Sequence, residues 1–219
     1  MSTPFDSLDV LASQEVDLTP SLRHIEIYTL RGLLTLLWHG PADVDAAVVA
    51  CGGAMGGLLG PAEGLYQRLG ETLLERGIGM VRVSYRRPND LDACVLDVAV
   101  AVQLAVGGGA SRVVVMGHSF GGAVAVRVGV AIPDVVAGVV TFSTQSAGCE
   151  VAGALAPRPL LLFHGDRDEI LPVEASAVVR EIAGVGELVV LPNDGHLLAK
   201  SGAILEERLL EWLPEVLAP

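Results

Sequence analysis

Apolar and amphipathic segments alternate along most of this chain. Short runs dominated by Val, Leu and Ala predict strands covered on both faces, because a strand of a parallel sheet between two helical layers is continuously apolar. These runs lie at 46–51, 80–85, 112–116, 135–142, 159–164 and 187–191. Longer segments closed by Gly or Pro predict helices at 62–76, 90–106, 122–132, 172–183 and 201–217. From residue 46 onward, strands and helices therefore take turns.

This order predicts an α/β fold, with a mostly parallel central sheet of about eight strands and helices on both of its faces. The loops at the carboxyl ends of such strands carry the active site. Two further runs at 24–30 and 33–38, joined at Arg31-Gly32, predict a hairpin that precedes the alternating part. The start of the chain is acidic and lacks this patterning. We therefore divide the chain into an acidic segment at 1–22 and a single domain at 23–219.

Charge and composition limit the kinds of molecule that this protein can bind. The chain has 14 basic and 26 acidic residues and a net charge of −12, which argues against nucleic acid and anionic membranes as partners. Its mean hydropathy is +0.53, yet no apolar stretch approaches the roughly 18 residues of a membrane span. The chain start resembles no secretory signal, and three scattered cysteines suit neither a disulfide framework nor a zinc site. We expect a cytoplasmic protein that holds no metal.

A Gly-x-Ser-x-Gly motif stands where the predicted strand 112–116 meets the predicted helix 122–132. It reads Gly117-His118-Ser119-Phe120-Gly121. A serine hydroxyl attacks a carbonyl carbon only when a base takes its proton and when it stands clear of the backbone. A sharp strand-to-helix turn with small residues two positions before and after the serine meets the second condition. The motif and its context predict Ser119 as a nucleophile.

Two polar turns farther along the chain can supply a base and an acid. The turn after strand 159–164 holds two candidate carboxylates, Asp166 and Asp168, and the turn after strand 187–191 holds His196. Both turns follow strand ends, as Ser119 does, so the three groups should meet at one edge of the sheet. We interpret His118 and His164, which lie beside glycines at strand ends, as packing residues with no catalytic part.

The chain order of serine, carboxylate and histidine resembles that of the α/β-hydrolases, and the resemblance covers about residues 24–217. It is closest to small lidless members that are similar to dienelactone hydrolases and serine esterases. The run His-Gly-x-x-Asp-x-x-x-Pro at 164–172 matches the acid loop of that family with Asp168 in the acid's place, and Asp194-Gly195-His196 matches its histidine loop. Dienelactone hydrolases carry a cysteine nucleophile, whereas this chain has Ser119, so their substrate is not carried over.

The resemblance also implies an oxyanion hole. The backbone amide of Phe120 is one candidate donor. The second should follow strand 46–51, where relatives often have His-Gly-x; aligning Gly52-Gly53 there makes Ala54 the donor. The histidine is missing here, so Met55 stays open as the donor and is otherwise a pocket wall. The glycines at 52–57 lack the Gly-Lys-Ser/Thr of a phosphate loop, and we expect no cofactor.

The sequence thus predicts a serine hydrolase that cleaves small carboxylic esters or thioesters through an acyl-enzyme, with Ser119, Asp168 and His196 as its triad. The segment between Phe142 and Pro159 is too short for a lid, so the site should be shallow or closed by a partner chain, such as a second copy in a homodimer. Two other function classes stay open. One is an acyltransferase with the same triad, and the other is a binding protein without activity on this fold.

Overall fold

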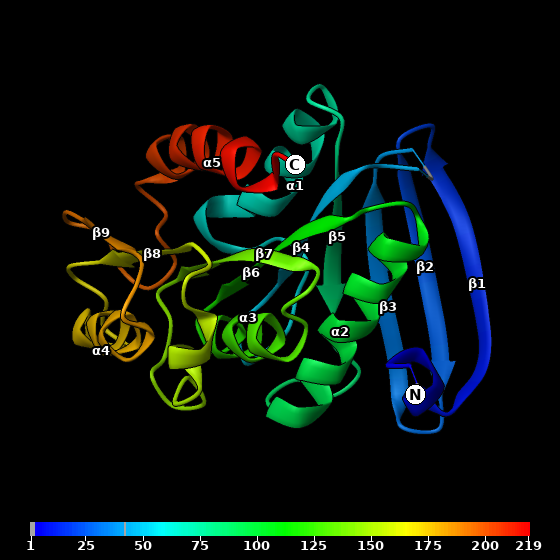
Figure 1. Ribbon diagram of the computed structural model, residues 1–219, viewed down its shortest axis with the longest axis horizontal. Helices are drawn as coiled ribbons and strands as arrows, with labels where there is room; N and C mark the ends of the chain where they lie inside the picture. Colours follow the sequence, from blue (N-terminus) through cyan, green and yellow to red (C-terminus); the bar gives the residue numbers. More distant parts are fainter. Residues whose placement is uncertain (1–2, 42) are drawn as a thin grey trace.

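The apolar runs form the strands of one mixed sheet in a computed structural model, which describes residues 3–41 and 43–219. Within these residues the sheet has nine strands in the order β1-β2-β3-β5-β4-β6-β7-β8-β9 (Figure 1). The strands are β1 (Val10–Thr19), β2 (Leu22–Thr29), β3 (Gly32–His39), β4 (Ala46–Cys51), β5 (Ile78–Ser84), β6 (Arg112–His118), β7 (Val136–Phe142), β8 (Leu160–Gly165) and β9 (Glu187–Leu191).

The pairing of the strands divides the sheet into two parts. The pairs from β1 through β2 and β3 to β5 are antiparallel, and Thr29 of β2 faces Gly32 of β3 across the predicted hairpin. The pairs from β5 through β4, β6, β7 and β8 to β9 are parallel. The parallel strands end at the same edge, so the loops that follow β4, β6, β8 and β9 are brought together there.

Five α-helices, counted over the described residues, cover the two faces of the sheet (Figure 1). One face packs against α2 (Leu91–Gly107), α3 (Phe120–Ala131) and α4 (Glu174–Ala183) and forms the larger apolar core. The other face packs against α1 (Pro61–Leu74) and α5 (Gly202–Leu217) around a second core that includes Phe142 and Phe163. None of these helices in the described ranges combines the length and hydropathy that crossing a bilayer requires. The mostly parallel sheet with helices on both faces, predicted from the strand and helix order, is confirmed.

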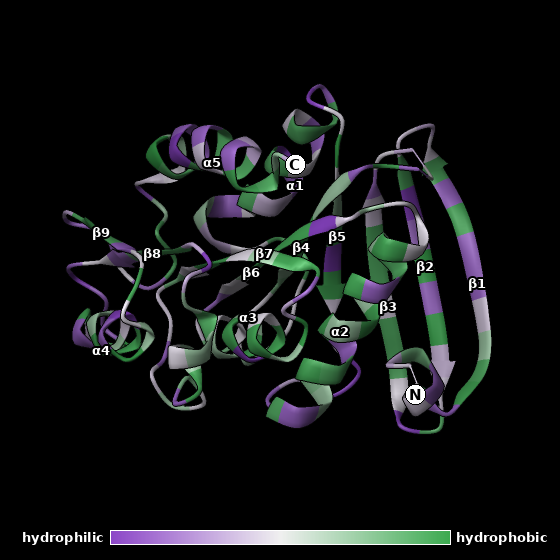
Figure 2. Ribbon diagram, viewed as in Figure 1, coloured by the Kyte–Doolittle hydropathy of each residue, from purple (hydrophilic) through white to green (hydrophobic). Residues whose placement is uncertain are grey.

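The acidic start of the chain contributes a strand that the sequence pattern does not reveal. Val10–Thr19 forms β1, which pairs with β2 along its whole length, so the sheet extends beyond the boundary drawn at residue 22. Almost every β1 residue is exposed, and hydrophilic and hydrophobic positions mix along it (Figure 2). An edge strand with this exposure carries no apolar run to mark it. Leu8, just before β1, is fully buried in the larger core and fastens this segment to the domain.

The connection between β7 and β8 is as short as the sequence indicates. Among the described residues it holds one turn of 3-10 helix, η2 (Ala152–Leu155), and no helical lid. The same stretch carries the buried residues Cys149 and Leu155, so it packs against the domain rather than extending over the sheet edge. The carboxyl edge of the parallel strands is therefore left open.

His39, at the end of β3, is buried against Gly70 of α1, and this burial has a consequence for stability. Burial, with a smaller contribution from the nearby Arg82 cation, lowers the pKa of His39 from 6.5 to about 4. Between pH 6.5 and pH 4, His39 is therefore mostly protonated in the unfolded chain and mostly neutral in the folded chain. The free energy of unfolding should fall as the pH drops from 6.5 towards 4.

Urea denaturation at pH 7 and pH 4.5 tests this expectation. Wild type should lose more stability between the two pH values than His39→Gln, because the variant has no imidazole to protonate at this position. Equal losses in the two proteins would contradict it, as would an NMR resonance of His39 that titrates near its ordinary pKa of 6.5.

Candidate active site

Ser119 occupies a strained turn between β6 and α3. Its φ of 57° and ψ of −120° are unusual for a residue with a side chain. Its amide donates to the carbonyl of Phe142 on β7 at 2.8 Å, which fixes the turn to the neighbouring strand. The side chain is half-buried and lines a pocket. This is the geometry of a nucleophile on a sharp strand-to-helix turn.

The glycines around Ser119 are required because backbones meet there. A Cβ added to Gly117 would overlap the carbonyl oxygen of Gly121, and one added to Gly121 would overlap the carbonyl oxygen of Gly52 at the end of β4. A Cβ on Gly122 would overlap the hydroxyl of Thr144. The start of α3 therefore lies directly against the ends of β4 and β6, which brings the 52–60 loop beside Ser119.

His196 and Asp168 form a buried pair. The Nδ1 atom of His196 lies 2.7 Å from Oδ2 of Asp168, and the carboxylate is fully buried. Its other oxygen, Oδ1, accepts hydrogen bonds from the amides of Ile170 and Leu171 at 2.8 and 2.9 Å. Burial alone would raise the pKa of Asp168, but the hydrogen bonds from Leu171, His196 and Ile170 outweigh it and hold the pKa below its ordinary value. A charged carboxylate therefore orients the imidazole.

The other carboxylates nearby serve the turns themselves. Asp166 is exposed and accepts a hydrogen bond from the amide of Asn193 at 2.6 Å. Asp194 is buried and binds the amides of Gly195 and Lys200 at 3.0 and 3.1 Å, which closes the turn that carries His196. The structure thus brings Asp168, and not Asp166, to the histidine.

Ser119 and His196 line one pocket of about 560 Å³ at the open edge of the sheet. The 52–60 loop, Ile170 and Leu197 also line it. Ala54 and Met55 both line it, and the Met55 side chain stands at its mouth, 93% exposed. Phe120 is buried with its ring against Tyr85, and its amide is in the first turn of α3, where backbone donors have no partner within the helix.

Two tyrosines that the sequence analysis missed hold the start of the 52–60 loop. The hydroxyl of Tyr66, on α1, donates to the carbonyl of Cys51 at 3.0 Å, and the hydroxyl of Tyr85, after β5, donates to the carbonyl of Gly52 at 3.0 Å. Both side chains are buried, in the cores on opposite faces of the sheet. No local sequence signal marks them, because their partners are backbone atoms far away in the chain.

The two other histidines near the site are buried and have specific partners. His118 is buried, its ring centre lies 4.9 Å from that of His196, and its Nε2–H donates to the carbonyl of His196 at 2.9 Å. Burial lowers the pKa of His118 to about 4, so its ring is neutral near neutral pH. His164 is fully buried and lies beside Asp168.

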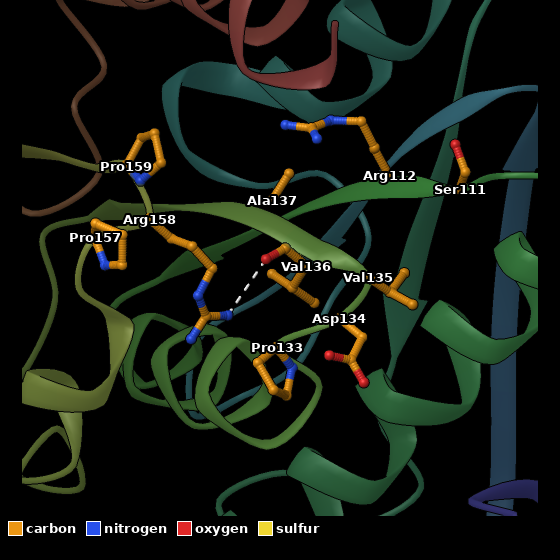
Figure 3. A pocket seen from close by; sticks show the side chains of 10 residues that line it. All are labelled: Ser111, Arg112, Pro133, Asp134, Val135, Val136, Ala137, Pro157, Arg158 and Pro159. Atoms are coloured by element: carbon orange, nitrogen blue, oxygen red, sulfur yellow. Dashed lines mark hydrogen bonds between the residues drawn. The ribbon is translucent and has the colours of Figure 1, made fainter. Parts of the chain in front are cut away.

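A second hollow, of about 350 Å³, lies at the opposite edge of the sheet (Figure 3). It is at the amino ends of β6 and β7, next to Pro159, and is lined by Arg112 and Arg158. Arg158 donates to the carbonyls of Gly129, Val136 and Ala154, and Arg112 donates to that of Val216. These arginines bind backbone carbonyls of α3, β7, η2 and α5, and Ser119 is not among the residues that line the hollow. In the described part of the chain, His, Cys, Asp and Glu nowhere gather in threes that could hold a metal ion.

Comparisons with known proteins agree with this architecture. A family model described as phospholipase/carboxylesterase matches residues 95–196, which include Ser119, Asp168 and His196. No match to a curated protein was found.

Three solved structures are similar over almost their whole length. Est1E from Butyrivibrio proteoclasticus is 18% identical, with a TM-score of 0.74 over 90% of this chain and 99% of that one. A dienelactone hydrolase from Anabaena variabilis is 16% identical, with a TM-score of 0.75 over 93% and 98%. XC6422 from Xanthomonas campestris, described as a serine hydrolase without lid, is 18% identical, with a TM-score of 0.72 over 92% and 98%.

At these identities the likeness shows the fold, and the residues matched by the family model contain the pair at His196 and the strained turn at Ser119. The chain therefore has the fold of the α/β-hydrolases, and its residues 95–196 are similar to phospholipases and carboxylesterases.

Proposed function

We propose that the protein is a serine hydrolase that cleaves small carboxylic esters or thioesters through an acyl-enzyme. The observation that carries the proposal is the buried hydrogen bond of 2.7 Å between His196 and Asp168, made by a histidine that lines the same pocket as Ser119. A histidine held in this way keeps its proton on Nδ1 and leaves Nε2 free to accept another.

Each residue then has a chemical role. Oγ of Ser119 attacks the carbonyl carbon of the ester while Nε2 of His196 takes the hydroxyl proton. The imidazolium that forms is stabilised by Asp168, and it then protonates the leaving alcohol or thiol. Water then attacks the acyl carbon and gives a proton to Nε2 of His196, and His196 returns this proton to Oγ of Ser119 as the acid leaves. The pocket has no lid among the described residues, and this access for water favours hydrolysis over transfer to another acceptor.

The oxyanion is assigned to the amides of Ala54 and Phe120. The amide of Gly56 donates to the carbonyl of Gly53 at 2.9 Å, and the carbonyl of Gly53 and the N–H of Ala54 belong to one planar trans peptide. The N–H of Ala54 must therefore point away from Gly56. Gly53 itself packs against Ser119, since an added Cβ would lie 3.5 Å from that of the serine. This supports Ala54 as the donor and Met55 as a wall of the pocket.

The lining of the pocket indicates what kind of ester it accepts. None of the described residues that line it is Asp, Glu, Lys or Arg. Four large apolar side chains at its mouth are exposed: those of Met55, Leu59, Ile170 and Leu197. A charged acyl group would lose its hydration here without gaining a partner. Ferulic acid is bound in a structure of Est1E, which shares the fold, and this supports an acyl group of modest size. We infer that the substrate is an uncharged ester with a small acyl group.

A fluorophosphonate probe should label the protein once, at Ser119, because among the described serines Ser119 combines a strained turn with a place in the same pocket as His196. Ser119→Ala should abolish labelling. The matched control is Ser146→Ala, a half-buried serine in the loop after β7, and it should be labelled like wild type. Mass spectrometry of the modified peptide measures the site. Labelling that persists in Ser119→Ala would rule out the proposal.

The two carboxylates of the acid loop should differ in effect. Asp168→Asn should lower kcat by several orders of magnitude, about 10⁴-fold, because the amide favours the wrong imidazole tautomer. Asp166→Asn should cost about tenfold or less, since this side chain only binds the amide of Asn193. Single-turnover acylation, with circular dichroism as a check on folding, measures both. A crippled Asp166→Asn beside an active Asp168→Asn would reverse the assignment.

A series of p-nitrophenyl esters should show a preference for short, uncharged acyl groups. We expect kcat/KM to be higher for butyrate than for chains of about ten carbons or more, because the connection from Phe142 to Pro159 builds no wall around a long chain. The hemisuccinate, which matches butyrate in length but carries a charge, should be the poorer substrate. A preference for the long or the charged ester would contradict this inference.

A further inference from the structure

His164 is placed against the carboxylate of Asp168 although it does not reach the pocket. It lies one residue before the end of β8, and its side chain is fully buried. Its Nε2 atom is 3.1 Å from Oδ2 of Asp168, the same oxygen that lies 2.7 Å from Nδ1 of His196. One carboxylate oxygen is therefore held between two imidazole rings.

Both nitrogens of the His164 ring have partners. Nε2 lies 3.0 Å from the carbonyl oxygen of Leu171, and Nδ1 lies 2.7 Å from the hydroxyl of Ser176 on α4. A carbonyl only accepts, so Nε2 carries a hydrogen and donates it to Leu171. In the neutral ring Nδ1 then accepts from the hydroxyl of Ser176, which is also fully buried. The ring is thus fixed between the acid loop and α4.

Leu171 connects this ring to the orientation of the acid. Its amide donates to Oδ1 of Asp168, and its carbonyl accepts from His164. Both backbone groups of Leu171, its amide and its carbonyl, are therefore hydrogen-bonded. The carboxylate of Asp168 cannot rotate or withdraw without breaking one of these buried hydrogen bonds. Losing such a bond leaves a buried polar group unpaired, which is costly.

We propose that His164, braced by Ser176, is a positioning residue that holds the carboxylate of Asp168 in the orientation that binds His196. The proposal rests on the proposed function. His164 is absent from the lining of the pocket that Ser119 and His196 share. It acts only through Asp168 and Leu171. Residues of this kind, which orient a group that acts directly, commonly change activity more than they change the fold.

Three variants test the proposal. His164→Met fills the same space without hydrogen bonds, His164→Gln keeps an amide that can donate to Leu171, and Ser176→Ala removes the brace. The control is His39→Met, which also replaces a buried histidine, but on β3 and away from the site. Two experiments are made on each variant. Steady-state kinetics gives kcat and KM for p-nitrophenyl butyrate, and proton NMR gives the low-field signal of the His196 Nδ1–H, assigned by its loss in His196→Ala.

We expect His164→Met to lower kcat by roughly 10- to 100-fold with little change in KM, and to broaden or shift the low-field signal. His164→Gln should recover part of both, and Ser176→Ala should show a smaller loss of the same kind. His39→Met should leave both unchanged, whatever it does to thermal stability.

A His164→Met variant that folds, keeps kcat within about threefold of wild type and keeps the low-field signal would overturn the proposal. If His164→Met does not fold, the same result in Ser176→Ala overturns it. The NMR signal needs no substrate. If wild type neither hydrolyses esters nor reacts with the fluorophosphonate, the proposed function fails, while the signal in the variants still decides whether His164 positions Asp168.

Discussion

Backbone meets backbone at the centre of this molecule, where the ends of β4 and β6 and the start of α3 come together without side chains between them. The Gly117, Gly121 and Gly52 contacts allow it, and a single Cβ would force the segments apart. The strained turn at Ser119 can exist only inside this contact, because the surrounding sheet must offset its cost. The same contact sets the 52–60 loop beside the serine. The geometry of the site is therefore a property of the sheet rather than of the loops alone.

The second requirement is a carboxylate kept charged inside the protein. Asp168 is fully buried, and a buried charge is stable only when hydrogen bonds replace its lost hydration. Here two amides, the ring of His196 and the adjacent ring of His164 surround it. These partners come from the acid loop, the histidine loop and the end of β8. The pair of Asp168 and His196 can therefore form only when these three segments are packed together. The geometry of the site thus depends on the folding of the carboxyl-terminal half.

Much of this architecture could be predicted because it depends on local sequence patterns. Buried parallel strands are continuously apolar, so β4 to β9 lie close to their predicted ranges. The motif and the turn residues point to Ser119, Asp168 and His196 as candidates, and the structure pairs Asp168 with His196 and lines one pocket with Ser119 and His196. Interactions that depend on tertiary contacts could not be predicted in this way. The exposed strand β1 has no apolar run, the hydroxyls of Tyr66 and Tyr85 bind backbone carbonyls, and His164 follows the pattern of a packing residue although it touches the acid. In each case the role of the residue depends on a partner that is distant in the sequence, and the local pattern does not show that partner.

The short connection between β7 and β8 also has a kinetic consequence. Enzymes with a mobile cover must open before substrate enters and again before product leaves, and that movement often limits turnover. In the described residues nothing has to move to expose this pocket, so entry and exit should be governed by diffusion. Solvent viscosity should then affect the rate only by slowing the diffusional encounter of substrate and protein. An oil–water surface should not activate the protein, because no cover has to be displaced.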